Sequence, residues 1–347
     1  MFSFDGFTFP LYPEFKVVIP PKSDVHHHLE QFRPDLIHVL SPVAMGVAGM
    51  WQARRQHIPV VASFHTDVPG YVAHYGLAAL ESPIWAAMRF IHNQADLNLC
   101  PSHFTYEQLA SRGIHSLRLW TRGVDTDQFH PNRASAEWRA RLTDGEPEKP
   151  LLIFVGRLSL EKRVHWLPDL VQRFPDVRLA IVGDGPERQS LEQQCRDLPV
   201  VFTGYLQGED LAQAYASADI FVFPSASETL GNVVLEAMAS GLAVVAADKG
   251  GPRELITSNH DGLLFSSQSF ESLVSLVGHL LVQPQLQSRL RINARTSAMT
   301  RTWSSVLDTL LGDYAEVIRT GTRESRSRFS RTGRSQPVGR YSPWYTK

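Results

Sequence analysis

The sequence predicts an α/β protein with two doubly wound domains, each built on a parallel β-sheet, and a cleft between them. With 347 residues the chain is too long for one ordinary hydrophobic core, but it fits two domains well. Its strand candidates are continuous apolar runs without polar alternation, as expected when both faces of a parallel sheet are buried. Helix-length segments separate these runs, which is typical of successive βαβ units.

The strand candidates fall into two series on either side of a polar break. The first series is LIHVL (36–40), PVVASF (59–64), DLNLC (96–100) and LRLW (117–120). The second is LLIFVG (151–156), VRLAIVG (177–183), VVFTG (200–204), DIFVFP (219–224), AVVAA (243–247) and GLLF (262–265). The break RLTDGEPEKP (141–150) contains Asp144-Gly145 and two prolines, so it predicts a loop or linker. We therefore expect an N-terminal domain over 1–140 and a C-terminal domain over 148–300.

Composition excludes several classes of protein. The chain is 43% hydrophobic and 20% charged with a net charge of −1, which predicts a globular protein and argues against nucleic acid as the main partner. No apolar run reaches the roughly 18–20 residues that a membrane span needs, and the N-terminus lacks the pattern of a secretory signal. The two cysteines, Cys100 and Cys195, have no metal-ligand spacing and predict buried hydrophobes in a reducing, cytoplasmic compartment.

The C-terminal stretch from about Gly321 is basic and rich in Ser, Gly and Pro. It carries seven Arg or Lys residues against one Glu and shows no periodicity, so 321–347 is predicted to be a disordered tail. An electrostatic tether to anionic lipid is the alternative interpretation.

The segment FVGRLSLEKRV (154–164) places two cations in the loop after a buried strand. Arg157 offers a planar fork and Lys162 a point charge, and together they suit a diphosphate. The alternative is a pair of solvated loop cations. The turn IVGDGPE (181–187) is a weaker sign of nucleotide contact, because short glycine pairs are common.

The segment SETLGNVVLEAMASG (227–241) predicts an anion-binding helix start with a carboxylate on either side. Thr229, Leu230 and Gly231 can present backbone N–H groups at an electropositive helix N-terminus. Glu228 precedes the helix, where it suits hydroxyls of a transferred sugar, and Glu236 lies within it, where it suits ribose hydroxyls. Together with the two cations, these residues predict a site for a nucleoside diphosphate that carries a sugar.

At this point a family resemblance can be named. ETLGNVVLE resembles the E-x7-E element of the retaining glycosyltransferases of family 4, whose two Rossmann-like domains form the GT-B fold. VGRLSLEK and GDGP are similar to that family's donor-diphosphate loop and following turn. The resemblance implies Glu228 at the donor sugar, Glu236 at the ribose, and Arg157 and Lys162 at the diphosphate. ASFHTDVPGYVAHYGL resembles the family's strand-end histidine segment, which would place His65 at the donor sugar.

Longer segments look like the sulfoquinovosyltransferases of this family, which move sulfoquinovose from UDP to diacylglycerol. These segments are FPLYPEFKVVIP, FRPDLIHVLSP, HTDVPGYVAHYGL, HNQADLNLCPS, TRGVDTDQFHP, DGEPEKPLLIFVGRLSLEK and GYLQGEDLAQAYASADIFVFPSASETLG. Two departures, Asp67 in place of an expected His and the run KGGPRELI (249–256), favour related lipid or polyol mannosyl- and glucosyltransferases, some of which use GDP donors. The donor is therefore expected to be UDP-sulfoquinovose, with GDP-mannose or UDP-glucose as alternatives.

The resemblance also implies that part of the N-terminal domain is absent and that the reaction needs no metal. The family's first strand and glycine-rich loop have no counterpart, so an N-terminally truncated, inactive nucleotide-binding remnant is a further alternative. No Asp-x-Asp pair follows a strand, and Asp125 and Asp127 are interpreted as structural. We expect a metal-independent transfer without a cofactor, in which Arg157, Lys162 and the helix start take the leaving-group charge.

A lipid acceptor implies contact with a membrane surface. The apolar segment LAALESPIWAAMRFIHN (77–93) is interpreted either as a core-facing helix or as a docking helix. The periodic segment TWSSVLDTLLGDYAEVIR (302–319) is expected, with its helix over 303–320, to cross back onto the first domain. We expect a cytoplasmic protein, peripheral on the membrane face, and the sequence leaves its oligomeric state open.

Overall fold

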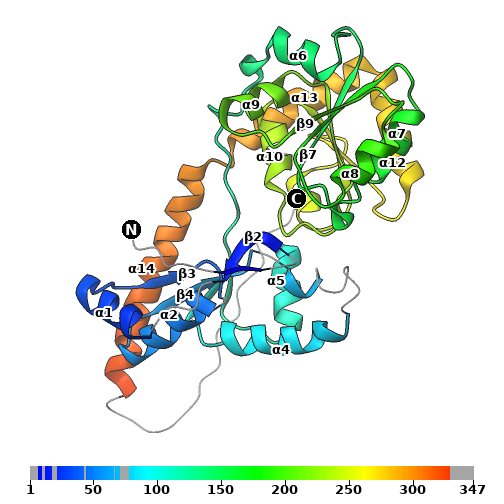
Figure 1. Cartoon of the computed structure of the whole chain (residues 1–347). Coiled ribbons are helices and arrows are strands. Elements are labelled where there is room, and N and C mark those ends of the chain that lie inside the picture. Colours follow the sequence, from blue (N-terminus) through cyan, green and yellow to red (C-terminus); the bar gives the residue numbers. More distant parts are fainter. Residues whose placement is uncertain are drawn as a thin grey trace.

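The computed structural model describes residues 7–9, 12–17, 22–42, 44–65, 67–70 and 78–328. Its strands form a four-stranded parallel sheet, a six-stranded parallel sheet and one two-stranded hairpin. The predicted pair of α/β domains is confirmed, with the smaller sheet in the N-terminal domain and the larger one in the C-terminal domain (Figure 1).

The N-terminal sheet has the strand order β3-β4-β5-β6. All four predicted runs form these strands, each within two residues of its expected length. The strands are β3 (Ile37–Val39), β4 (Val60–Ser63), β5 (Leu97–Cys100) and β6 (Leu117–Leu119). The intervening helices are α1 (Lys22–Phe32), α2 (Ala44–Arg55), η1 (Ala78–Leu80), α4 (Glu81–His92) and α5 (His103–Ser111). A separate antiparallel hairpin, β1 (Phe7–Phe9) and β2 (Tyr12–Val17), was not predicted.

Alternate residues of β4 show how this sheet is covered on both faces. Val61 packs in a cluster with residues of the long C-terminal helix, whereas Val60 and Ala62 pack with Met50 and Ala53 of α2. Successive side chains of a strand point to opposite faces, so an unbroken apolar run fills two layers. Both cysteines are buried, as predicted, and burial raises the pKa of the Cys100 thiol to about 12.

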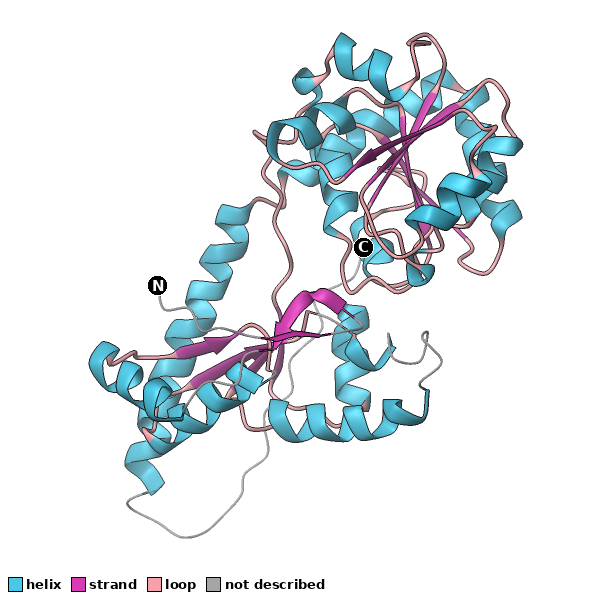
Figure 2. Cartoon of the chain, in the orientation of Figure 1, coloured by secondary structure: helices cyan, strands magenta, loops and turns pink. Residues whose placement is uncertain are grey.

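The C-terminal sheet has the parallel order β12-β11-β10-β7-β8-β9, with helices on both sides (Figure 2). All six predicted runs form its strands. They are β7 (Leu151–Val155), β8 (Arg178–Val182), β9 (Val200–Gly204), β10 (Ile220–Phe223), β11 (Ala243–Ala247) and β12 (Leu263–Phe265). The helices are η3 (Leu160–Lys162), α7 (Trp166–Gln172), α8 (Arg188–Gln194), α9 (Gly208–Ala216), α10 (Asn232–Ala239), α11 (Gly251–Leu255), α12 (Phe270–Val282) and α13 (Pro284–Met299).

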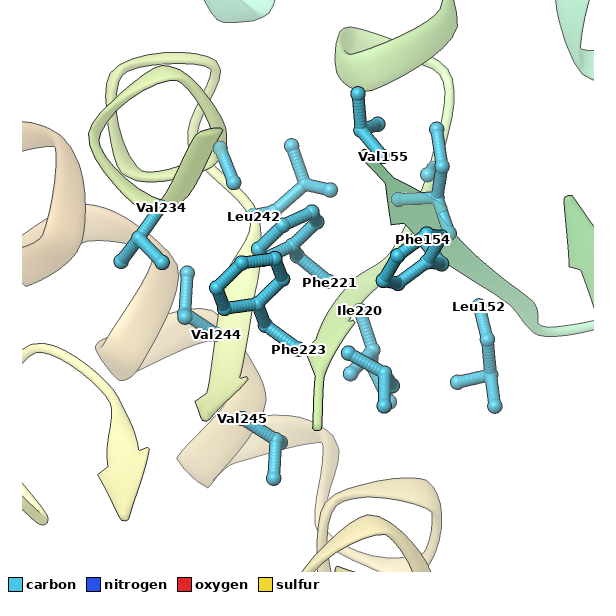
Figure 3. Close-up of a cluster of buried hydrophobic side chains, with 14 of the residues drawn as sticks. Leu152, Phe154, Val155, Ile220, Phe221, Phe223, Val234, Leu242, Val244 and Val245 are labelled. Carbon is cyan, nitrogen blue, oxygen red and sulfur yellow. The ribbon is translucent and has the colours of Figure 1, made fainter. Parts of the chain in front are cut away.

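The centre of this sheet is an aromatic layer between β7 and β10 (Figure 3). Phe154 and Phe223 lie with ring centroids 6.1 Å apart, and Phe221 lies 5.7 Å from Phe223. From β7 the chain proceeds to β8 and β9 on one side, and then returns to β10, β11 and β12 on the other. Ligands of such sheets bind where the strand order reverses, which here is at the carboxyl ends of β7 and β10.

The boundary between the domains lies earlier than the predicted linker over 141–150. Between the domains, η2 (Pro131–Arg133) is followed by α6 (Ala136–Leu142), whose Trp138 and Leu142 belong to the core of the C-terminal domain. Burial of Trp138 and Leu142 therefore assigns α6 to the C-terminal domain, and the Asp144-Gly145 turn lies beyond this helix. The crossing is made near Val124, whose N–H donates to the carbonyl of Arg301 at 2.9 Å.

The last helix, α14 (Trp303–Arg328), returns to the N-terminal domain as expected. Val306, Leu310 and Val317 pack in one cluster with strand residues of the N-terminal sheet, and Arg118 of β6 bonds to Asp313 at 2.6 Å. The helix continues eight residues into the predicted disordered tail, since 321–328 contains Arg and Glu but no proline. The rest of the predicted tail, 329–347, lies outside the described residues.

Candidate functional site

A cleft of about 370 Å³ opens at the carboxyl ends of β7 and β10, where the fold predicts a ligand site. Residues from both domains line it. They are His65, Pro101, Arg122, Gly156, Arg157, Glu161, Lys162, Phe223, Glu228, Thr229, Leu230, Gly231, Asn232 and Val233. The cleft therefore brings together seven of the eight predicted site residues.

Glu236 is the predicted site residue that does not line this cleft. Its side chain points to Tyr215, whose hydroxyl donates to Oε2 at 3.0 Å. Burial raises the pKa of Glu236, and the hydrogen bond from Tyr215 opposes that shift. The carboxylate is therefore part of a buried pair, and its role at a ribose stays a prediction.

The loop after β7 supplies the cations of the C-terminal wall. Arg157 lies two residues after the end of β7, and Lys162 ends the single turn of η3. The GDGP turn supports this loop, because the N–H of Leu158 donates to the carbonyl of Asp184 at 2.9 Å. The glycine turn thus holds the cation loop through its backbone, and its residues do not themselves line the cleft.

Lys162 and Glu228 form an ion pair across the cleft floor, and both side chains are only 13% exposed. Glu228 Oε1 also accepts from Ser225 Oγ at 2.9 Å. A buried pair of this kind holds both side chains in place, and it offsets the charge of one cation before any ligand binds.

The segment between β10 and α10 presents its backbone to the cleft. Gly231 caps α10 with φ of 89°, a left-handed conformation that favours glycine. Behind it, α11 packs so closely that a Cβ on Gly251 would lie 2.1 Å from Leu230 Cα, and the Gly251 N–H donates to the Glu228 carbonyl at 2.9 Å. This packing fixes the predicted anion-binding helix start.

His65 lies on the N-terminal wall beside Arg122 and Trp120. An Arg122 guanidinium N–H lies 2.9 Å from His65 Nδ1, and the guanidinium stacks 4.9 Å from the Trp120 ring centroid. Burial, followed by the charge of Arg122, lowers the pKa of His65 to about 4. An imidazole with such a pKa is neutral at pH 7, so it can exchange hydrogen bonds with a ligand but adds no charge.

Hydrogen bonds between side chains and backbone groups join the two walls beside the cleft. Thr229 Oγ1 donates to the carbonyl of His65 at 3.2 Å, so the helix-start loop touches the histidine segment directly. Glu254 of α11 accepts from the N–H groups of His103 and Phe104 at the start of α5, at 2.7 and 2.6 Å.

Sequence reasoning missed two charged residues of the cleft. Arg122 follows the predicted strand 117–120, and the strand-end rule that found Arg157 would have found it too. Glu161 is buried, and its Oε1 accepts from Ser159 Oγ at 2.6 Å, whereas its buried Oε2 has no hydrogen-bond partner among the described residues. That oxygen is an available acceptor at the edge of the cation loop.

The acidic residues outside the cleft have structural contacts. Asp125 Oδ1 accepts from the N–H groups of Asp127 and Gln128 at 3.0 and 2.9 Å, which makes it a turn cap, as interpreted from the sequence. Asp67 bonds to Gly70 N and to Gln108 Nε2. Within the described ranges, no cluster of three or more His, Cys, Asp or Glu residues has the arrangement of a metal site.

Within the part of the chain that the structure describes, no helix is both long enough and apolar enough to span a membrane.

The sequence is similar to known glycosyltransferases in both domains. The profile for glycosyl transferases group 1 matches residues 137–297, and that for Glycosyltransferase Family 4 matches residues 2–128. The sulfoquinovosyl transferase SQD2 of Arabidopsis thaliana is 42% identical over 80% of this chain, although the match spans 55% of its own length. A GDP-mannose-dependent α-mannosyltransferase of Mycobacterium tuberculosis is 44% identical over 83% of this chain and 75% of its own.

Solved structures show the same fold. Anabaena HepE in complex with UDP superposes with a TM-score of 0.74 at 22% identity, covering 85% of this chain and 82% of that one. With two family profiles over successive domains and a relative of 44% identity over most of its length, the chain belongs to glycosyltransferase family 4 and has the GT-B fold.

Proposed function

We propose that this chain transfers a sugar from a nucleoside diphosphate donor to a hydroxyl group of a lipid acceptor. One observation carries the proposal: Arg157, the Lys162–Glu228 pair and the start of α10 line a single cleft between the two domains. Cations and a helix N-terminus suit a diphosphate, and a carboxylate beside them suits sugar hydroxyls. The best match for the substrates is UDP-sulfoquinovose and diacylglycerol, because the relative SQD2 is a sulfoquinovosyl transferase.

In the proposed reaction the donor's anomeric carbon passes through an oxocarbenium-like transition state as its bond to the diphosphate breaks. Arg157, Lys162 and the helix start stabilise the charge of the departing diphosphate without a metal ion or other cofactor. The acceptor hydroxyl attacks the anomeric carbon on the face from which the diphosphate departs, and its proton passes to the departing phosphate oxygen. Attack on that face retains the anomeric configuration. Glu228 orients the sugar, and neutral His65 hydrogen-bonds to it.

A GDP-mannose-dependent transfer is the second candidate. The mycobacterial α-mannosyltransferase shares 44% of aligned residues with this chain, slightly more than SQD2, and the match spans more of its own length. A UDP-glucose donor belongs to the same group of alternatives, because an α-monoglucosyldiacylglycerol synthase is 30% identical over 68% of this chain.

We place the enzyme on the cytoplasmic face of a membrane as a peripheral protein. In α4 the side chains of Trp85 and His92 are buried, whereas Phe90 is 61% exposed and Leu80, just before the helix, is 48% exposed. The helix thus covers the core with one face and leaves apolar groups on the other. A lipid acceptor requires such a protein to approach the bilayer, and exposed apolar side chains assist that approach.

A transfer assay on diacylglycerol vesicles tests the proposal. The purified chain is incubated with UDP-sulfoquinovose, UDP-glucose or GDP-mannose, and the lipid product is identified by mass spectrometry, with its anomeric configuration assigned by NMR. We expect a glycolipid with retained configuration, formed equally well in the presence of EDTA. Nucleotide binding without any product would instead identify an inactive remnant, and an inverted product would contradict the same-face mechanism.

A further inference from the structure

Arg122 occupies a fixed position at the base of the cleft. It follows β6 and directly precedes the crossing between the domains, where Val124 bridges to Thr302. The neighbouring Gly123 has no room for a side chain, because an added Cβ would lie 2.5 Å from the backbone nitrogen of Trp303. The backbone next to Arg122 is therefore packed tightly against the chain at the start of α14.

The contacts of Arg122 leave its charge without an opposing charge. Its guanidinium stacks on Trp120 at 4.9 Å and lies 2.9 Å from Nδ1 of the neutral His65. Among the residues that the structure describes, no carboxylate forms a salt bridge with it. Burial lowers the pKa of Arg122, which means that the cation has lost part of its hydration. A partly desolvated cation gains more from an anion than one in open water does.

The opposite wall has a different charge balance. There Glu228 already offsets the charge of Lys162, and both side chains are largely buried. That wall also carries Arg157 and the buried Glu161, so its positive and negative side chains are equal in number. A diphosphate brings about two negative charges, so its binding needs further positive charge. Arg122 supplies it from the N-terminal domain, and a donor bound between the walls would be held from both sides.

We propose that Arg122 binds an anionic group of the donor from the N-terminal wall of the cleft. This inference rests on the proposed function, since it requires a nucleotide donor in the cleft. The anionic group is either the diphosphate or an acidic substituent on the sugar, such as a sulfonate or carboxylate. Either source has oxygens that suit the planar fork of an arginine.

Calorimetric titration of Arg122→Met and Arg122→Lys with UDP, UDP-glucose and UDP-glucuronic acid tests the proposal, with GDP titrated in parallel. For Arg122→Met we expect a loss of affinity of about 10- to 100-fold, the range for a hydrogen bond to a charged group. Arg122→Lys retains the charge without the fork and should lose less. The salt dependence of binding should also become shallower in Arg122→Met.

The chain offers a matched control in Arg112. This residue also stacks on a tryptophan, Trp85, at 4.9 Å, but it does not line the cleft, so Arg112→Met removes the same contact away from the site. Arg112→Met should leave nucleotide affinity unchanged. Thermal unfolding of each variant, followed by circular dichroism, separates a binding defect from a folding defect.

The three ligands distinguish the two sources of the anion. A loss of affinity for UDP itself in Arg122→Met assigns the residue to the diphosphate. A loss confined to UDP-glucuronic acid, with UDP and UDP-glucose unchanged, assigns it to an acidic sugar substituent. If a folded Arg122→Met binds all three ligands and GDP as the unmodified chain does, the proposal is overturned and the proposed function survives. If the unmodified chain binds no nucleotide, both are overturned.

Discussion

Lys162 and Glu228 are held together in the cleft before any ligand arrives, with each side chain 13% exposed. A diphosphate that binds beside them would contact the same lysine, so the ammonium group would interact with both the Glu228 carboxylate and the donor. We expect Lys162→Ala to lower kcat by about 100-fold or more, the scale of losing one preorganised stabilising group. The same loss is expected for Glu228→Ala, measured as initial rates of sugar transfer.

The effects of the Lys162 and Glu228 substitutions on turnover should be coupled. Removing either partner leaves the other charge buried without its counter-ion, so the two single changes should not add in the double variant. Near wild-type turnover in either single variant would remove that residue from the mechanism. Arg173→Ala, which breaks an exposed pair with Glu271, is a suitable control for a general loss of charge.

The low pKa values of His38 and His65 predict how stability depends on pH. Burial and the charge of Arg122 lower the pKa of both His38 and His65 from 6.5 to about 4. As the pH falls below about 6.5 the unfolded chain takes up these protons first, so the free energy of unfolding should decline until about pH 4. NMR titration of the ring protons checks this, and both resonances should stay at their neutral positions through pH 6. A midpoint near 6.5 for His65 would contradict its burial beside Arg122.

At the scale of elements, α11 packs against the loop that carries the predicted donor-binding backbone. Gly251 leaves no room for a Cβ against Leu230, so Gly251→Ala should destabilise the protein by about 1–3 kcal/mol and weaken nucleotide binding. Gly312 in α14 is the matched control, because an added Cβ there has nothing within 4 Å. Gly312→Ala should be neutral or slightly stabilising. Urea unfolding and calorimetry measure both effects, and equal stability of the two variants would contradict the packing.

The strands were predictable because each is a short, largely apolar run without polar alternation, and the ten parallel strands of the described chain lie where the runs lie. The hairpin β1–β2 was not predictable in this way, because Pro13 interrupts the apolar pattern of β2. The domain boundary was misplaced because Asp144-Gly145 is a turn signal wherever it occurs, whereas the packing of Trp138 depends on tertiary contacts.

Some site residues could likewise be predicted from local sequence patterns, whereas the contacts of others depend on the tertiary fold. Arg157, Lys162 and the 228–231 segment were found because each is a local pattern at the end of a strand. Arg122 also follows a predicted strand, but its contact with His65, which is 57 residues away in the sequence, depends on the tertiary fold. The orientation of Glu236 toward Tyr215 likewise depends on how α9 and α10 pack, which spacing alone does not reveal.

At the scale of the whole molecule, Glu254 links the two domains. Its two carboxylate oxygens accept from two backbone N–H groups at the start of α5. Its helix, α11, packs on the loop before α10. Glu254→Ala should therefore shift the domains toward a more open arrangement, with a larger radius of gyration by small-angle scattering and weaker nucleotide binding. Glu271→Ala, on an exposed surface pair, should leave both unchanged. An unaltered scattering profile for Glu254→Ala would show that this contact does not hold the domains together.

The central claim is that the cleft between the domains binds a nucleoside diphosphate through the cations of its walls. Calorimetric titration of the purified chain and of Lys162→Ala with UDP and with GDP tests it most directly. We predict that the unmodified chain binds UDP, with little response to GDP, and that Lys162→Ala binds it at least about 10-fold more weakly. Preference for GDP would move the assignment to a mannosyltransferase. Binding of neither nucleotide, or equal binding by Lys162→Ala, would contradict the account.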